Sequence, residues 1–271
     1  MKLLTLTQRV RAGGACAAAL LALSTQALAG AFNQQAGHGQ VIVTSNFSTA
    51  DEGFDAVGKF SPASNFRKFE TTALVEYGFT DWLTAIVKPS VLSVHTGGVA
   101  SADYTGLGMT EIGAQARLLQ FDTSVFGIQA TLRIPGSSNS ANPLLAGSTR
   151  PEEDVRLLYG HGFKLGGWDS FVDVQVGYRW RNGGPPDEFR WDATFGVRPV
   201  AQWLLMLQSF NTVSQPSNSV VFPRNSLHKL QASAVYDFDK AWSGQLGIFA
   251  AVAGQNALRE RGVLAAVWRR F

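Results

Sequence analysis

Charged side chains recur at every second position in two neighbouring segments of the chain. In residues 172–181 the polar positions include Asp173, Gln175, Arg179 and Arg181, and mostly apolar residues lie between them. Residues 189–198 repeat the pattern, with charged side chains alternating with aromatic and small apolar ones. A two-residue period is that of a β-strand, so the charges share one face. Carboxylates and guanidinium groups on such a face can pair with each other or bind a charged solute.

The same period continues through much of the chain and defines a mixed set of residues on the polar face. These residues are Glu111, Arg117, Gln129, Arg133, Arg156, Asp173, Gln175, Arg179, Arg190, Asp192 and Arg198. We expect residues 168–198 to form a hairpin in which Arg179 faces Asp192 and Asp173 faces Arg198, because opposite charges then lie side by side. A shifted register would instead face Arg179 with Arg190.

Few residues could carry catalysis or bind a metal. The histidines are His38, His95, His161 and His228. Ser226 and His228 lie two positions apart on one predicted strand, which makes them the candidate site of a lipid-modifying enzyme. The acidic runs 51–55 and 152–154 could bind divalent ions together with lipopolysaccharide, although solvated loop charge is the default interpretation. We therefore expect no catalytic residue, no metal and no cofactor.

The first 29 residues have the features of a secretory signal peptide. Three basic residues precede the apolar run 17–23, and Ala27, Leu28 and Ala29 end the segment before Gly30. Cleavage at Ala29/Gly30 would remove the only cysteine, Cys16, and with it any thiol chemistry. Of the 23 Lys and Arg side chains, three lie in this segment, so 20 remain against 20 Asp and Glu. This balance excludes nucleic-acid binding, which needs a surplus of positive charge.

The connections between the predicted strands alternate between long and tight. A soluble sandwich has no reason to keep that alternation, whereas an outer-membrane β-barrel has short periplasmic turns and longer external loops. We therefore predict an all-β fold, a transmembrane antiparallel up-and-down barrel over residues 38–271, after a short periplasmic lead at residues 30–37. Its 12 strands are expected at 40–47, 67–78, 83–94, 110–118, 126–134, 153–165, 168–181, 189–198, 203–212, 226–238, 242–252 and 258–271.

Aromatic residues mark both ends of these strands, as in the girdles of membrane barrels. Those near the tight turns are Tyr77, Phe79, Trp82, Phe121, Phe163, Trp168, Trp203, Tyr236, Phe238 and Trp242. Those near the long loops are Phe66, Phe69, Tyr104, Trp180, Phe189, Trp191 and Phe210. The terminal Phe271 resembles the signal read by the bacterial barrel-insertion machinery. The expected location is the bacterial outer membrane, with its lipid and lipopolysaccharide as partners.

Four short motifs add a resemblance to a known family. They are Tyr77 to Leu83, Gly106 to Gly108 followed by Glu111 to Gly113, Leu132 to Gly136, and Trp268 to Phe271. With these motifs the chain resembles the outer-membrane family named for the meta-pathway of phenol degradation. The resemblance implies a transporter of small aromatic or hydrophobic compounds, and it transfers no substrate-binding residue.

The leading hypothesis is a channel through which small organic solutes diffuse passively along a charged lumen. The alternatives are a lipid-modifying enzyme at Ser226 and His228, and a closed structural barrel. A lumen filled by salt bridges or by residues 30–37 would indicate the closed barrel. The loop 136–151 is expected on the surface, with inward folding as a constriction the alternative.

Overall fold

The computed structural model of the chain describes residues 30–98, 101–138, 142–145 and 149–271. The predicted signal peptide, with Cys16, lies outside the described residues, as does part of the loop 136–151. Among the described residues, the helices found are all too short or too polar to cross a membrane.

Fifteen strand segments make up nearly the whole fold. Three pairs of segments continue one another, namely β3 with β4, β5 with β6, and β14 with β15, so the barrel has twelve strands. The bounds are β1 Gly39–Phe54, β2 Phe60–Thr80, β3 Leu83–Lys88, β4 Ser90–Thr96, β5 Ala102–Leu107, β6 Thr110–Phe121, β7 Ser124–Ile134, β8 Glu152–Leu165, β9 Trp168–Arg181, β10 Glu188–Val200, β11 Trp203–Ser214, β12 Ser226–Asp237, β13 Trp242–Gln255, β14 Ala257–Leu258 and β15 Arg261–Arg270.

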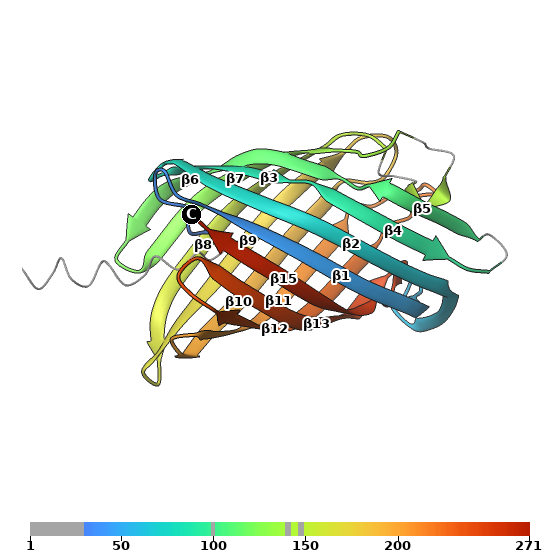
Figure 1. Cartoon of the computed structure of the whole chain (residues 1–271). Helices are drawn as coiled ribbons and strands as arrows, with labels where there is room; N and C mark the ends of the chain where they lie inside the picture. The colour runs from blue at the N-terminus through green and yellow to red at the C-terminus, as the bar shows by residue number, and fades with distance from the viewer. Residues whose placement is uncertain (1–29, 99–100, 139–141, 146–148) are drawn as a thin grey trace, which may run out of the picture.

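The strands form one closed antiparallel barrel. β1 pairs with β2 on one side and with β14 and β15 on the other, which closes the sheet. Figure 1 shows the strands running obliquely around the barrel, as closure requires. The prediction of a twelve-stranded up-and-down barrel is therefore confirmed.

Several strand bounds differ from those predicted, including the ends of β1 and β2, and Pro89 explains the break between β3 and β4. Proline has no N–H to donate to a ladder, so the predicted strand 83–94 breaks there into β3 and β4. The Pro89 carbonyl still accepts the N–H of Ala73 at 3.1 Å. Beyond the break, β4 pairs with β5, which forms where a loop was expected at residues 96–105.

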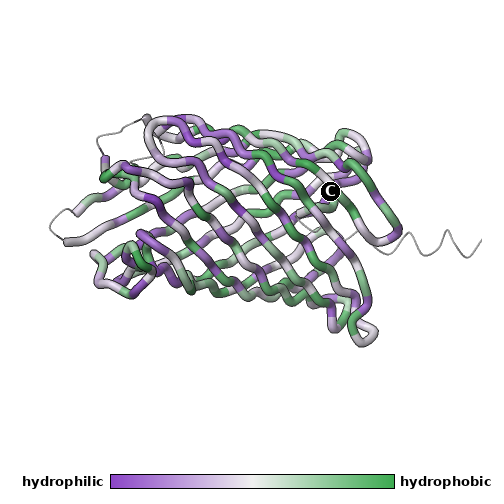
Figure 2. The backbone as a smooth tube through the Cα atoms, turned by 180° about the vertical axis from the view of Figure 1, so that it is seen from behind, coloured by the Kyte–Doolittle hydropathy of each residue, from purple (hydrophilic) through white to green (hydrophobic). Residues whose placement is uncertain are grey.

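The two ends of the barrel differ in their connections. At one end, here called the tight-turn end, two-residue turns join β2 to β3, β6 to β7, β8 to β9 and β10 to β11. The C-terminus lies at this end (Figure 1). The opposite end, called the long-loop end, carries longer connections, including that between β7 and β8. Hydrophobic and hydrophilic residues alternate along the strands (Figure 2).

Large apolar side chains cover the outer surface. Leu246 is 70 % exposed and Ile248 64 %, and Val174 and Val176, predicted to face lipid, are each 39 % exposed. Aromatic residues named above for the tight-turn girdle, among them Phe79, Trp82 and Phe238, are also exposed. Such a surface suits hydrocarbon rather than water. Arg269 lies two residues before Phe271 and shares its outward face, where an apolar residue is usual. Its guanidinium lies 5.1 Å from the centroid of the Trp242 ring, and this cation–π contact stabilises the charge there.

Candidate functional site

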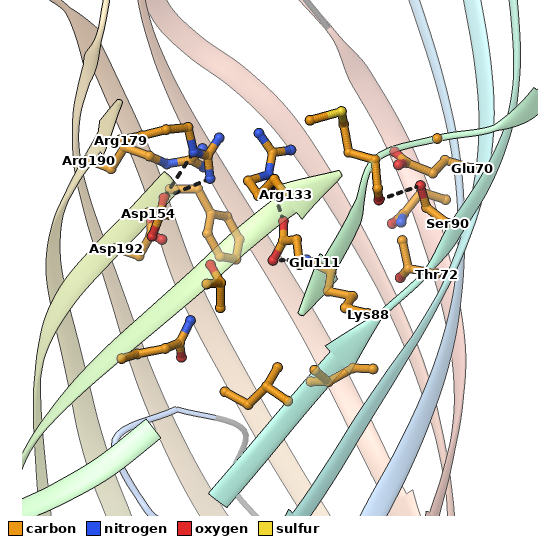
Figure 3. Close-up of a pocket in the computed structure, with 18 of the residues that line it drawn as sticks. Glu70, Thr72, Lys88, Ser90, Glu111, Arg133, Asp154, Arg179, Arg190 and Asp192 are labelled. Atoms are coloured by element: carbon orange, nitrogen blue, oxygen red, sulfur yellow. Dashed lines mark hydrogen bonds and ion pairs between the residues drawn. The ribbon is translucent and has the colours of Figure 1, made fainter. Parts of the chain in front are cut away.

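A cavity of about 630 Å³ occupies the barrel interior. It extends from Gly30, in the segment before β1, to Leu144 and Leu145 in the loop between β7 and β8. The cavity wall includes nine of the eleven predicted polar-face residues, namely Glu111, Gln129, Arg133, Arg156, Asp173, Gln175, Arg179, Arg190 and Asp192. Figure 3 shows the arginines and carboxylates of this set gathered on one side, facing Glu70, Thr72 and Ser90.

The structure places Arg117 and Arg198 away from the cavity. A bulge separates Arg117 from Leu119 near the tight turn, and the Arg117 guanidinium donates to Gln120 Oε1 at 2.6 Å. Arg198 Nη1 lies 2.8 Å from Asp237 Oδ2, close to the next tight turn. Both residues lie at the tight-turn end, beyond the wide part of the lumen.

The register of the β9–β10 hairpin differs from both predicted alternatives. Arg179 faces Glu188, Asp192 faces Gln175, and Arg198 faces Asp169. The cause is Asp187. Its carboxylate accepts the backbone N–H of Arg181 at 2.8 Å and the hydroxyl of Tyr178 at 3.0 Å. The Asp187 side chain thus occupies the Arg181 N–H, and the ladder between β9 and β10 begins at the pair Arg179 and Glu188.

Charged side chains on β3 and on β6 to β10 form one continuous network. Arg179 lies 2.9 Å from Asp154 and 3.6 Å from Glu188, and Arg156 lies 2.7 Å from both Asp154 and Asp192. Around this centre are the pairs Arg133–Glu111, Lys88–Glu111, Arg133–Glu152, Arg181–Glu152, Arg181–Glu188 and Arg190–Glu188. Six cations and five carboxylates participate, which leaves one positive charge in excess.

Arg190 is the most weakly paired cation of the central group. Its Nη1 is 3.7 Å from Glu188 Oε2, beyond hydrogen-bond distance, and its buried Nε has no hydrogen-bond partner. Leaving a buried donor unpaired costs free energy, so this group is primed to bind an acceptor that enters the cavity. Figure 3 shows Arg190 beside Arg179, above Asp154 and Asp192.

Two apolar features of the cavity depart from the predictions. Phe210, assigned to the outer girdle, lines the cavity and lies opposite Asp192 in the ladder, on the inward face. The prediction for Phe210 was wrong because this residue lies on the inward face of β11 and not on the lipid-facing one. Leu144 and Leu145 also line the cavity, so the described part of the loop 136–151 folds inward, as the less favoured alternative had it.

The inward face turns apolar toward the tight-turn end. This layer consists of Ile42, Val125, Leu158, Phe171, Leu204, Met206, Val235, Ala266 and Trp268, all buried inside the barrel. The sequence predicted a charged lumen, whereas in the structure the charged part of the lumen ends at this apolar layer. A barrel interior packed with apolar side chains resembles a protein core.

Residues 30–37 are called the lead. Residues 30–34 lie inside the tight-turn end rather than outside it, whereas Gln35, Ala36 and Gly37 are exposed. The ring of Phe32 packs against both groups of the apolar layer, and Ala31 is fully buried. Asn33 Nδ2 donates to Thr84 Oγ1 and to the Gln115 carbonyl, and Gln34 Nε2 donates to Glu76 at 3.1 Å. The lead thus forms the floor of the cavity, a placement for which its polar sequence offered little signal.

Two glycines of the wall make room for the lead. A Cβ on Gly160 would lie 2.8 Å from the Phe32 ring, and a Cβ on Gly78 would lie 2.2 Å from the carbonyl oxygen of Gln35. Larger side chains at these positions would push the lead out of the barrel.

The candidate enzyme residues are engaged elsewhere. His228 Nδ1 lies 2.9 Å from Asn211 Oδ1, and its ring contacts Trp191 at 5.6 Å between centroids. The His228 Nδ1 is therefore hydrogen-bonded to Asn211 and not to Ser226, as a catalytic pair would require, and Ser226 is buried. His161 stacks between Tyr159 and Phe163 on the outer surface.

The acidic runs are also accounted for by neighbouring cations. Glu152 and Asp154 point inward to the arginines named above, and Glu153 accepts a hydrogen bond from Asn182. Asp51 and Glu52 pair with Arg261 and Arg259. Among the described residues, no group of three or more potential ligands could hold a metal ion.

Solved structures of outer-membrane barrels resemble this chain. An outer membrane channel from Pseudomonas putida F1 shares 18 % identity with a TM-score of 0.66, covering 91 % of this chain and 100 % of the other. The NanC porin shares 9 % identity with a TM-score of 0.56, covering 84 % and 98 %. The translocator domain of the autotransporter NalP from Neisseria meningitidis shares 11 % identity with a TM-score of 0.53, covering 89 % and 91 %.

No family model and no curated protein sequence matches the chain. The structural likenesses establish the fold of an outer-membrane barrel, which agrees with the fold implied by the resemblance of the four motifs.

Proposed function

We propose that this protein is an outer-membrane channel for small organic solutes, closed at rest by its own lead. The observation that carries the proposal is the polar cavity of about 630 Å³, enclosed by a barrel whose outer surface is apolar. Its volume suits a small solute, since ligand sites of that class measure roughly 300–1,000 Å³. Phe271 would be read by the barrel-insertion machinery, and the outer surface would contact outer-membrane lipid and lipopolysaccharide.

The arginine-rich side of the cavity favours solutes that combine an acidic group with an apolar body. Arg133, Arg179 and Arg190 gather there (Figure 3), and Arg190 has an unpaired donor. Phe210 and Leu144 add apolar surface on the same cavity wall. Aromatic and other small organic acids have the matching chemistry, because a guanidinium binds a carboxylate while the ring packs on apolar side chains.

Passage through the barrel requires the lead to move. Phe32 and Ala31 occupy the apolar layer at the tight-turn end, so a solute that enters from the long-loop end meets the lead as a floor. The barrel wall is held by its own ladder and does not depend on the lead. Displacement of the lead would therefore open the lumen without unfolding the barrel.

A reversible crosslink tests this proposal. Ala31 Cβ lies 3.1 Å from an ideal Cβ at position 160, so an Ala31→Cys/Gly160→Cys pair is close enough to form a disulfide after a small adjustment. We expect the oxidised variant to give a non-conducting planar bilayer and the reduced one to conduct, because the cysteine side chain at position 160 strikes the Phe32 ring and displaces the lead once the crosslink is broken. Deletion of residues 30–37 should give a permanently open channel. As controls, Gly160→Cys alone should conduct under oxidising and reducing conditions alike, and Ala31→Cys alone should match the wild type.

A second candidate is a closed barrel with a structural role. The observations that favour it are the dense salt bridges along one side of the lumen and the lead within it. If bilayers that contain the protein without residues 30–37 stay tight, the closed barrel replaces the channel.

A further inference from the structure

Asp173 is a buried carboxylate in the wall beside the lead, and its surroundings differ from those of its neighbours. It is 3 % exposed, and its oxygens accept hydrogen bonds from the Ala31 N–H at 2.5 Å and Gln175 Nε2 at 2.9 Å. Asp154 and Asp192 each lie 2.7 Å from Arg156. Within the described ranges, by contrast, Asp173 has no salt-bridge partner within 4 Å.

A second acid deepens this charge deficit. Glu76 is buried in the same part of the interior, and its carboxylate accepts hydrogen bonds from the amides of Gln34 and Gln40. No lysine or arginine of the described segments forms a salt bridge with it. A buried carboxylate without a cation is costly, and the described residues place two such acids, Asp173 and Glu76, at this end of the lumen.

Gly30 is pressed against the Asp173 carboxylate. A Cβ built on Gly30 would lie 2.5 Å from Oδ2 and 3.1 Å from Oδ1. The Gly30 Cα therefore lies beside the carboxylate, and Ala31, the next residue, donates its N–H to Oδ2. The start of the lead lies against this acid, and the Gly30 nitrogen is one bond from that Cα.

We propose that Asp173 is the binding site for the α-ammonium group that signal-peptide cleavage creates at Gly30. In the precursor the Gly30 nitrogen is an uncharged amide. A signal peptidase adds water across the Ala29–Gly30 bond; the carboxylate leaves with the signal peptide, and the new amine takes up a proton. The cation then pairs with Asp173, so processing completes the site that holds the lead in the barrel.

The proposal explains the glycine at position 30. Any side chain there would strike the carboxylate, whereas glycine allows the ammonium group to approach it. It also explains why, among the described acids of β8 to β10 that line the cavity, Asp154 and Asp192 form salt bridges with arginine and Asp173 does not. The site depends on cleavage after Ala29 and stands whether or not the barrel conducts.

Amine labelling of the folded mature protein tests the proposal. Mass spectrometry first locates the N-terminus, which must be Gly30. The α-amine is then reacted at neutral pH with an acetylating reagent, in detergent, and the rate is compared between wild type, Asp173→Asn and Asp192→Asn. We expect the α-amine to react at least ten times faster in Asp173→Asn, and Asp192→Asn to match the wild type.

A second variant keeps the test decisive if Asp173→Asn fails to fold. One glycine inserted between Ala29 and Gly30 moves the ammonium group away from an intact Asp173, and we expect the same tenfold acceleration. A mature N-terminus other than Gly30, or equal labelling rates in the wild type and the folded variants, would overturn the proposal. Conductance is not part of this readout, so a failed channel proposal leaves the result interpretable.

Discussion

The ring of Phe32 lies against the bare backbone of Gly160, where a Cβ would come within 2.8 Å of two ring atoms. This contact joins the lead to β8 inside the barrel, next to Leu158 and Val125. The size of one wall residue therefore determines whether the lead fits. The first prediction follows from that relationship.

Replacing Phe32 with alanine should weaken the docking of the lead. Burial of a phenylalanine ring contributes about 2 kcal/mol, which corresponds to a roughly 30-fold change in the ratio of docked to free lead. Gly160→Val should act in the same direction by collision. Single-channel recording should show more frequent opening in both variants, while Phe238→Ala on the outer surface should match the wild type. If both variants opened as often as the wild type, the lead would not control the opening of the channel.

Neutralising Arg179 should destabilise the barrel. Arg179→Met leaves Asp154 and Glu188 buried with one cation fewer, and breaking a buried pair in this way costs about 3–5 kcal/mol. The free energy of unfolding in urea, measured in lipid vesicles, checks this. Arg117→Met is the control, because Arg117 bonds only to Gln120 near a turn among the contacts described. Equal losses in the two variants would show that the network is not a stabilising unit.

A charge on the outer face of β9 should hinder membrane insertion. Val174→Arg places a guanidinium in the apolar band, at a cost of about 2–4 kcal/mol near the bilayer centre. Leu165→Arg, at the tight turn of the preceding strand, should cost about 1 kcal/mol or less. Folding yields into vesicles should rank the variants accordingly. A reversed ranking would contradict the assignment of the outer face.

Removing the charge of Arg190 should reduce any preference for anions. Arg190→Gln deletes the cation with the unpaired Nε and leaves the excess charge of the network at zero. The reversal potential across a salt gradient, recorded with the lead deleted, should shift toward cation preference by several millivolts. Lys164→Gln, near the end of β8 where the lysine pairs with Asp169, should leave the reversal potential unchanged. Identical reversal potentials would exclude Arg190 from the conduction path.

The alternation of side chains and of loop lengths was enough to predict the barrel, its strand number and most of the inward residues. Both signals can be read from short segments of the sequence. In a closed barrel one face of each strand points into the lumen and the other points outward, so the alternation assigns each residue to a face. The hairpin register could not be read in this way, because it depends on the Asp187 side chain accepting the Arg181 N–H. A loop composition rich in Gly and Pro does not reveal that bond.

The apolar layer left a trace in the sequence that periodicity alone obscures. Residues 203–207 and 263–268 are almost continuously apolar, and such runs are typical of strands buried on both faces. The position of the lead is harder to infer. Asn33, Gln34 and Gln35 indicate a solvated segment, and only Phe32 between small and polar residues suggests an anchor.

The attachment of the lead to the wall has a mechanical consequence. Outside the strands, the isolated bridge of the described chain joins Ala36 to Gly78, with the N–H of Gly37 donating to the Gly78 carbonyl. The ladder between β1 and β15, by comparison, pairs ten residues of each strand. A force applied at Gly30 would therefore peel off eight residues, about 27 Å of extended chain, before it loads the first strand. In a pulling experiment the lead should detach and extend at low force, and the barrel should resist until a higher force is reached.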